Sequence, residues 1–157
     1  MLKIGDKAPK FNLPDQNGKV HKLDEFLKMG DYLLLYFYPK DDTSGCTMQA
    51  CGIKDNIPQF EKLDSTVVGI SPDSVKSHTK FVDKYDLNFT ILSDESKETL
   101  EKYEVWKEKS MYGKKYMGVV RTSYLIDSKG KIVKVYEKVK PETHADMVLA
   151  DLENLRK

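Results

Sequence analysis

One unbroken apolar run constrains the fold more than any other feature of the sequence. It spans residues 32–38, seven positions of leucine, tyrosine and phenylalanine, with Gly30 before it and Pro39 after it. A run without polar alternation predicts a strand that is buried on both faces. Such a strand needs helices above and below its sheet, which is the arrangement of α/β proteins. The run is far shorter than the ~20 residues that a membrane-spanning helix requires, so we expect no membrane association.

The order of the remaining apolar runs, helical segments and turn residues predicts a mixed sheet. A second buried strand over residues 66–71 follows about 27 residues with helical spacing, which we expect to break near Gly52. A crossover of this length joins neighbouring parallel strands. Further elements are expected as short helices over 23–29 and 96–103, a helix over 74–85, a hairpin of strands over 122–126 and 131–139, and a last helix opened by Pro141. This order predicts a three-layer α/β domain with a mixed central β-sheet flanked by helices.

Composition narrows the range of functions. Lys and Arg number 26 and Asp and Glu 25, so the net charge of +1 gives no general attraction to nucleic acid or anionic membranes. The 157 residues show neither a repeat nor a Pro/Gly/Ser linker, so we expect one domain over 1–157. The first residues lack a basic stretch followed by an apolar run, which predicts a cytoplasmic protein without a secretory signal.

The two cysteines lie in a segment that follows the first buried strand. Asp42, Thr43 and Ser44 are residue types that begin helices. With Thr43 or Ser44 as the cap, Cys46 falls in the first turn, near free backbone N–H groups and the positive end of the helix dipole. Both favour the thiolate, which is the reactive form of cysteine. The segment therefore predicts a nucleophilic Cys46, although a buried and inert thiol is the ordinary alternative.

The second cysteine, Cys51, is too far along a helix to pair with Cys46 directly. Residues five apart are rotated by about 140° and rise about 7.5 Å, which separates their Cα atoms by about 8.6 Å. A disulfide needs Cα atoms within about 7 Å. Pairing would therefore require local unwinding, and Gly52 predicts a short and fragile helix. We expect Cys46 to react first and Cys51 to resolve the product after the helix opens.

A metal site or a Cys–His dyad is the other common use of cysteine. Two thiols are too few for a four-thiolate zinc or iron–sulfur site. His21, His78 and His144 are scattered, and none has ligand spacing to the cysteines. His78 lies on an apolar helical face and is expected to pack in the core. We therefore expect no metal.

The pattern Pro39-x-x-x-Thr43-x-x-Cys46 resembles the active-site pattern of the peroxiredoxins. The step of five residues to Cys51 is similar to the peroxiredoxin Q, or bacterioferritin comigratory protein, branch. Arg121 stands where that family carries its active-site arginine. Further similar blocks lie at residues 5–15, 68–73, 92–94, 106–118 and 120–127. The chain departs from many relatives by carrying Ser44 in place of proline, so we expect a more mobile loop.

The resemblance implies a thioredoxin-like fold and the reduction of hydrogen peroxide and organic hydroperoxides. Cys46 would be the peroxidatic nucleophile and Cys51 the resolving thiol. Thr43 would hydrogen-bond the peroxide or the thiolate, Arg121 would activate the thiol and orient the substrate, and Pro39 would shield the thiolate. The resemblance also implies a thioredoxin- or glutaredoxin-like reductant, no cofactor, and a monomer in preference to a dimer.

Two rival functions remain open at this point. A general thiol–disulfide oxidoreductase or reductase-dependent chaperone would use the same two thiols, but the five-residue spacing and Arg121 disfavour it. A non-enzymatic redox-sensing module on the same fold would use the change of shape on oxidation. The basic and aromatic residues 106–117 are expected to form a loop beside the active site, rather than a nucleic-acid surface.

Overall fold

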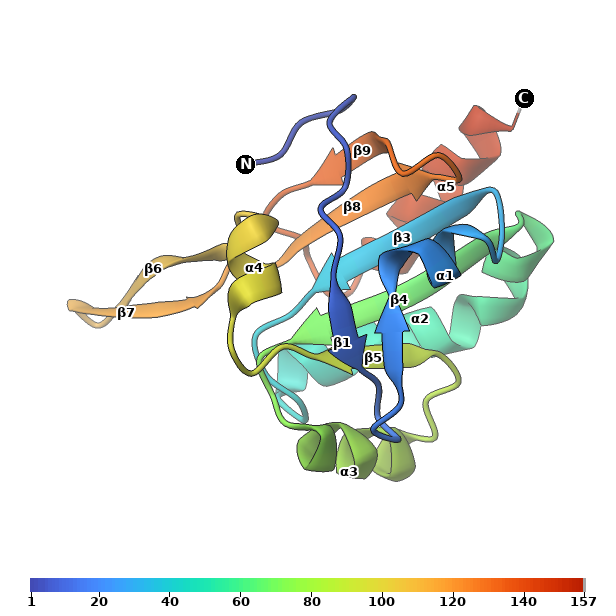
Figure 1. Cartoon of the computed structure of the whole chain (residues 1–157). Helices are drawn as coiled ribbons and strands as arrows, with labels where there is room; N and C mark the ends of the chain where they lie inside the picture. Colours follow the sequence, from blue (N-terminus) through green and yellow to red (C-terminus); the bar gives the residue numbers. More distant parts are fainter. Residues whose placement is uncertain (157) are drawn as a thin grey trace.

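The computed structural model describes residues 1–156 and centres on a mixed five-stranded sheet (Figure 1). The strand order is β5-β4-β3-β8-β9, with β3, β4 and β5 parallel and β8 and β9 antiparallel to their neighbours. The bounds are β3 Tyr32–Phe37, β4 Ser65–Ser71, β5 Thr90–Ser93, β8 Thr122–Asp127 and β9 Ile132–Tyr136. The predicted apolar run is the middle strand, and the predicted mixed sheet is confirmed.

The alternating side chains of β3 divide the interior into two cores. Leu33, Leu35 and Phe37 pack in a core beneath the N-terminal segment and two short helices, α1 (Leu23–Leu27) and α4 (Glu98–Lys102). Leu34 and Tyr36 face the opposite core. That second core lies beneath the longer helices α2 (Ser44–Lys62), α3 (Val75–Tyr85) and α5 (His144–Leu155). A small antiparallel pair, β1 (Asn12–Pro14) and β2 (Val20–Lys22), crosses the first face (Figure 1). Because helices cover both faces of the five-stranded sheet, the predicted three-layer arrangement is confirmed.

Helix α2 is continuous, so the predicted break near Gly52 is wrong. The helix passes through Gly52 and also through Pro58, which lacks the N–H that a helix interior uses. Ile53 and Phe60 are fully buried on its inner face and hold both halves against the sheet. The long crossover therefore owes its continuity to packing, which outweighs the local preference of glycine and proline.

The last helix begins later than predicted. Pro141 lies in a turn, and α5 starts at His144. The N–H of Val139 donates to the carbonyl of Arg121, so the chain after β9 is still tied to the segment before β8. The ring of Pro141 also approaches Gly45, where a Cβ would lie 3.6 Å from it. The helix therefore starts only once the chain has passed this contact.

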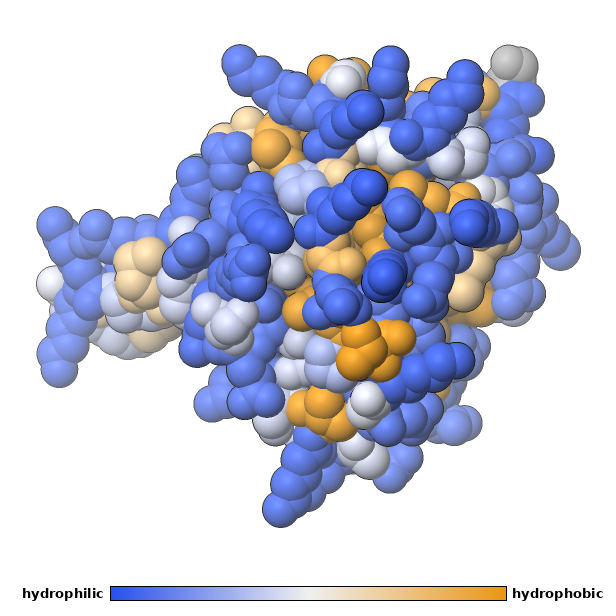
Figure 2. Space-filling model, viewed as in Figure 1, coloured by the Kyte–Doolittle hydropathy of each residue, from blue (hydrophilic) through white to orange (hydrophobic). Residues whose placement is uncertain are grey.

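Residues 106–119 form a hairpin instead of the predicted loop. Strands β6 (Trp106–Met111) and β7 (Lys114–Val119) pair antiparallel about a two-residue turn at Tyr112 and Gly113. Both turn residues have positive φ, 52° and 78°, which suits the twist of a hairpin. The hairpin projects from the body in Figure 1, and Figure 2 shows it as a mainly hydrophilic arm with a few apolar side chains. None of the helices within residues 1–156 is long and apolar enough to cross a membrane.

Candidate active site

Cys46 lies where the sequence predicted it, in the first turn of α2. Thr43 is the residue before the helix, and Cys46 is the third residue within it. Its side chain is only 2% exposed and its thiol is free. The loop from β3 to α2 leaves the carboxyl end of the central strand, so the thiol sits at the sheet edge where α/β proteins place their sites. The backbone N–H groups of this first turn have no partner within the helix.

Arg121 reaches the same thiol from a distant part of the chain. β8 runs antiparallel to β3 with Thr122 opposite Phe37, so the residue before β8 meets the end of β3. The Nη2 of Arg121 lies 3.3 Å from the Sγ of Cys46, and its Nη1 donates to the side-chain oxygen of Gln49. A guanidinium is always charged and offers its N–H donors in a fixed plane. The arrangement can therefore hold negative charge on sulfur and on an oxygen bound beside it.

The loop before Cys46 holds the other predicted residues, Pro39 and Thr43. Pro39 is half-buried, directly after the end of the β3 run. Thr43 begins the helix through its backbone, but its hydroxyl donates to the carbonyl of Lys40 at 3.0 Å and does not cap α2. The predicted N-cap position of Thr43 is therefore confirmed, although its hydroxyl closes the loop and accepts no N–H of the helix.

Cys51 lies in the same helix and is half-buried, with a free thiol. Since α2 is unbroken from Ser44 to Lys62, the helical spacing of about 8.6 Å between the two Cα atoms applies. That spacing exceeds the reach of a disulfide. The expectation of a short helix is wrong. The expectation that the helix must open before the thiols can pair stays a prediction.

Behind Arg121 lies a polar chain that sequence reasoning missed. Gln49 lies one turn after Cys46 on the same face of α2, and its side-chain nitrogen lies 3.1 Å from the Nδ1 of His144. The Nε2 of His144 lies 2.8 Å from the hydroxyl of Ser123. Burial, followed by the charge of Arg121, lowers the pKa of His144 to about 4. The i, i+3 spacing of Gln49 from Cys46 was the one signal in the sequence, whereas nothing in it paired Gln49 with His144.

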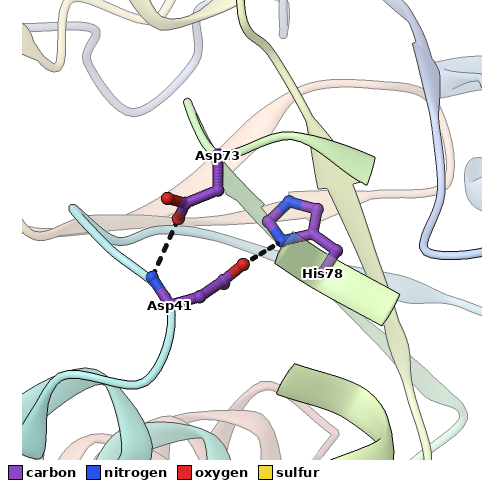
Figure 3. A group of neighbouring side chains, drawn as sticks. All are labelled: Asp41, Asp73 and His78. Carbon is purple, nitrogen blue, oxygen red and sulfur yellow. Dashed lines mark hydrogen bonds and ion pairs between the residues drawn. The ribbon is translucent and has the colours of Figure 1, made fainter. Parts of the chain in front are cut away.

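A second cluster anchors the loop that leads to Cys46, and Figure 3 shows its members Asp41, Asp73 and His78 facing one another. Asp41 lies in that loop, and its carboxylate accepts hydrogen bonds from Tyr38 and from Ser77 of α3, at 2.6 and 2.8 Å. His78 contacts the same carboxylate through Nδ1 at 2.6 Å and the carbonyl of Leu92 through Nε2 at 2.9 Å. The predicted core position of His78 is confirmed, since its side chain is fully buried.

The same cluster is the one group within residues 1–156 with the spacing of a metal site. Single ligand atoms of Asp41, Asp73 and His78 lie within 4.8 Å of one another. Both ring nitrogens of His78 and both carboxylate oxygens of Asp41 already contact protein partners, however, and Asp73 accepts from the Asp41 N–H at 2.8 Å. A metal would have to replace these hydrogen bonds. The cluster therefore acts as an anchor between α3 and the active-site loop.

A mixed sheet of this topology, with a buried thiol at the end of its central strand and an arginine against the sulfur, defines a thiol-based redox protein. The model of the AhpC/TSA family matches residues 4–135, and the chain belongs to this family. It is 49% identical over 148 residues to Peroxiredoxin Bcp of Escherichia coli, covering 94% of each chain. It is 41% identical over 154 residues to Peroxiredoxin Bcp of Bacillus subtilis, covering 98% of this chain and 97% of the other.

Solved structures agree with the sequence comparison. A cysteine-to-serine mutant of Xylella fastidiosa PrxQ superimposes with a TM-score of 0.93 at 33% identity, covering 100% of this chain and 99% of that one. The bacterioferritin comigratory protein of Xanthomonas campestris gives a TM-score of 0.86 at 37% identity, covering 94% and 92%. The predicted branch and the thioredoxin-like α/β fold are confirmed, and with them the assignment to the thiol-dependent peroxidases.

Proposed function

We propose that this chain reduces hydrogen peroxide and organic hydroperoxides with Cys46 as the peroxidatic nucleophile. The observation that carries the proposal is the 3.3 Å contact between the Cys46 sulfur and Arg121 at the start of α2. The related protein from Xanthomonas campestris is described in connection with alkyl peroxide reduction, which supports the inclusion of organic hydroperoxides.

The first step is a displacement on oxygen. The Cys46 thiolate attacks one peroxide oxygen, the S–O bond forms as the O–O bond breaks, and the departing oxygen takes a proton to leave as water or an alcohol. Negative charge grows on the leaving oxygen, where Arg121 and the free N–H groups of the first turn of α2 can stabilise it. In this proposal the Thr43 hydroxyl gives up its hydrogen bond to the Lys40 carbonyl and donates instead to the bound peroxide or the thiolate, and Pro39 limits access of water to the sulfur.

The second step makes a disulfide. Cys46 is now a sulfenic acid, and the Cys51 thiolate attacks its sulfur while hydroxide leaves as water with one added proton. Because α2 is intact from Ser44 onwards, its first turns must unwind for the two sulfur atoms to meet. A thioredoxin- or glutaredoxin-like dithiol then reduces the disulfide by exchange, which returns both thiols. No cofactor is required for any of these steps.

We also propose a single domain over residues 1–157 that works as a monomer in the cytoplasm. The two cores share β3, so no division of the sheet separates them. Apart from those of the hairpin β6–β7, the exposed large apolar side chains are scattered, and no element carries more than two, which are Met147 and Leu155 of α5. Scattered exposed apolar residues are usual on a monomer's surface.

The test is a titration of the reduced protein with one equivalent of hydrogen peroxide, followed by a count of free thiols. The parent should lose both thiols and turn over with thioredoxin, its reductase and NADPH. Cys46→Ser should neither consume peroxide nor turn over. Cys51→Ser is the matched control, because it should consume about one equivalent and stop as a sulfenic acid. Survival of both thiols in the parent, or turnover by Cys46→Ser at the parental rate, would contradict the proposal.

A further inference from the structure

The chain of contacts that begins at the Cys46 sulfur does not end at Arg121. It continues through Gln49 to His144, the first residue of α5, and then to Ser123 in β8. Gln49, His144 and Ser123 are 1% exposed or less. Three separate elements therefore meet in a dry polar path that leads to the reactive sulfur.

The hydrogen bonds along this path can run in one direction only. Arg121 can only donate, so the Gln49 oxygen must face it. The Gln49 amide nitrogen then faces His144 and donates, which makes Nδ1 of His144 an acceptor. Its hydrogen therefore lies on Nε2 and is donated to the Ser123 hydroxyl. A flipped Gln49 amide would set its NH₂ against the guanidinium, two donors facing each other.

The surroundings of His144 keep it in the neutral form that this path needs. A doubly protonated ring would place an N–H against the Gln49 NH₂. Among residues 1–156, the charge that acts on the ring is that of Arg121, and the titratable Tyr36 packs against the ring with centroids 5.8 Å apart. The position at the first turn of α5 adds the positive end of a helix dipole. Burial and the Arg121 charge both lower the pKa of His144, to about 4.

We propose that His144 is a positioning residue for peroxide reduction, which sets the Gln49 amide so that its oxygen holds Arg121 against the Cys46 sulfur. The inference rests on the proposed function. Arg121 has two terminal nitrogens, and only a fixed acceptor on Nη1 directs Nη2 to the sulfur. A displaced guanidinium would stabilise the leaving oxygen less well, since a shift of about 1 Å can cost a hundredfold in rate.

The contact between Gln49 and His144 should also depend on the redox state of the enzyme. Gln49 lies between Cys46 and Cys51, so unwinding residues 46–51 to close the disulfide removes the contact with His144. The disulfide form then leaves the imidazole without its partner on α2 and open to water. His144 should consequently titrate near the ordinary histidine value in the disulfide form and far below it in the reduced form.

The test compares His144→Leu in two backgrounds. In the parent, this variant leaves the Gln49 NH₂ without its acceptor, so the amide can leave the rotamer that holds Arg121, and the second-order rate of Cys46 oxidation by hydrogen peroxide should fall at least tenfold. In Gln49→Glu, the two carboxylate oxygens are equivalent, so either can hold Arg121 and no orienting partner is needed. There the same His144→Leu change should alter the rate by less than about threefold. An equal loss in both backgrounds would overturn the proposal, as would no loss in the parent.

A second variant and an NMR titration distinguish a positioning role of His144 from a general loss of structure. His144→Asn supplies an oxygen near the position of Nδ1 and should keep the rate within about threefold of the parent. NMR titration of His144 should give a pKa at least one unit lower in the reduced protein than in the disulfide form. Titration of His144 above pH 6 in the reduced protein would refute the relay by itself. Failure of the parent to consume peroxide would instead refute the proposed function.

Discussion

Replacing Gly52 with alanine should slow disulfide formation without slowing the attack on peroxide. Gly52 lies within α2 directly after Cys51, and a Cβ added there meets nothing within 4 Å. The methyl group therefore brings no clash, and its effect is on helix stability alone. Alanine favours a helix interior over glycine by about 1 kcal/mol, which lowers the population of the open segment about fivefold.

The fivefold change in the open population should appear as a fivefold change in the rate of disulfide formation. If Cys51 can attack only from the open helix, the rate of disulfide closure should fall about fivefold, with a sulfenic acid that lives about five times longer. At high peroxide, a longer-lived sulfenic acid is oxidised further to sulfinic acid, so the variant should inactivate sooner. Rapid-quench sampling with thiol blocking and mass spectrometry measures the three sulfur states directly. Peroxide consumption in the first turnover should equal that of the parent.

Asp55→Ala provides the matched control. Asp55 is exposed in the same helix, one turn beyond Cys51, and alanine is again the better helix former. If the opening ends near Gly52, this change should leave the rate of closure unaltered. Equal slowing by both variants would show that the whole helix opens. An unchanged rate in Gly52→Ala would refute the reasoning that opening limits closure.

Three further substitutions or conditions test other parts of the structure. Gly45→Ala should slow peroxide attack several-fold in single-turnover assays although it favours the helix, because a Cβ there would lie 3.3 Å from the Nη2 of Arg121. Gly69→Ala should lower the free energy of unfolding by about 1–3 kcal/mol in urea titrations, because its Cβ would lie 2.8 Å from the ring of Tyr36. Lowering the pH from 7 to 4 should reduce the free energy of unfolding by roughly 3 kcal/mol through His144 alone. The unfolded chain takes up a proton on this histidine near pH 6.5, whereas the folded chain, with a His144 pKa of about 4, does not. Urea unfolding of His144→Asn should show a correspondingly smaller loss across the same range, and an identical loss would contradict that assignment.

Much of the sheet could be predicted because its signals are local. The apolar run over residues 32–38 defines the central strand, and the turn at residues 127–130 defines the hairpin of β8 and β9. The position of Cys46 at the start of a helix follows from the residues that precede it. The role expected of Arg121 came only from the family resemblance, since 75 residues separate it from Cys46 and only the pairing of β3 with β8 joins them.

The errors arose where distant packing decides the outcome. Gly52 and Pro58 are local signals for a helix break, but the burial of Ile53 and Phe60 overrides them. The carbonyl of Lys54, which the missing N–H of Pro58 leaves free, accepts instead from the side chain of Asn88 at 3.4 Å. The contact of Gln49 with His144 joins residues 95 apart, and no spacing rule could have paired them.

The continuity of α2 also explains how one helix can serve two incompatible states. Thiol activation needs its first turn intact, and disulfide closure needs that turn opened. Opening the whole helix would expose Ile53 and Phe60, at roughly 1.5–3 kcal/mol for each side chain, and would slow closure by about two to four powers of ten. Opening only the residues before Gly52 leaves both side chains buried and ends the opening at a glycine, which is a weak helix former. The glycine that suggested two helices therefore marks the boundary between the part of α2 that moves and the part that stays.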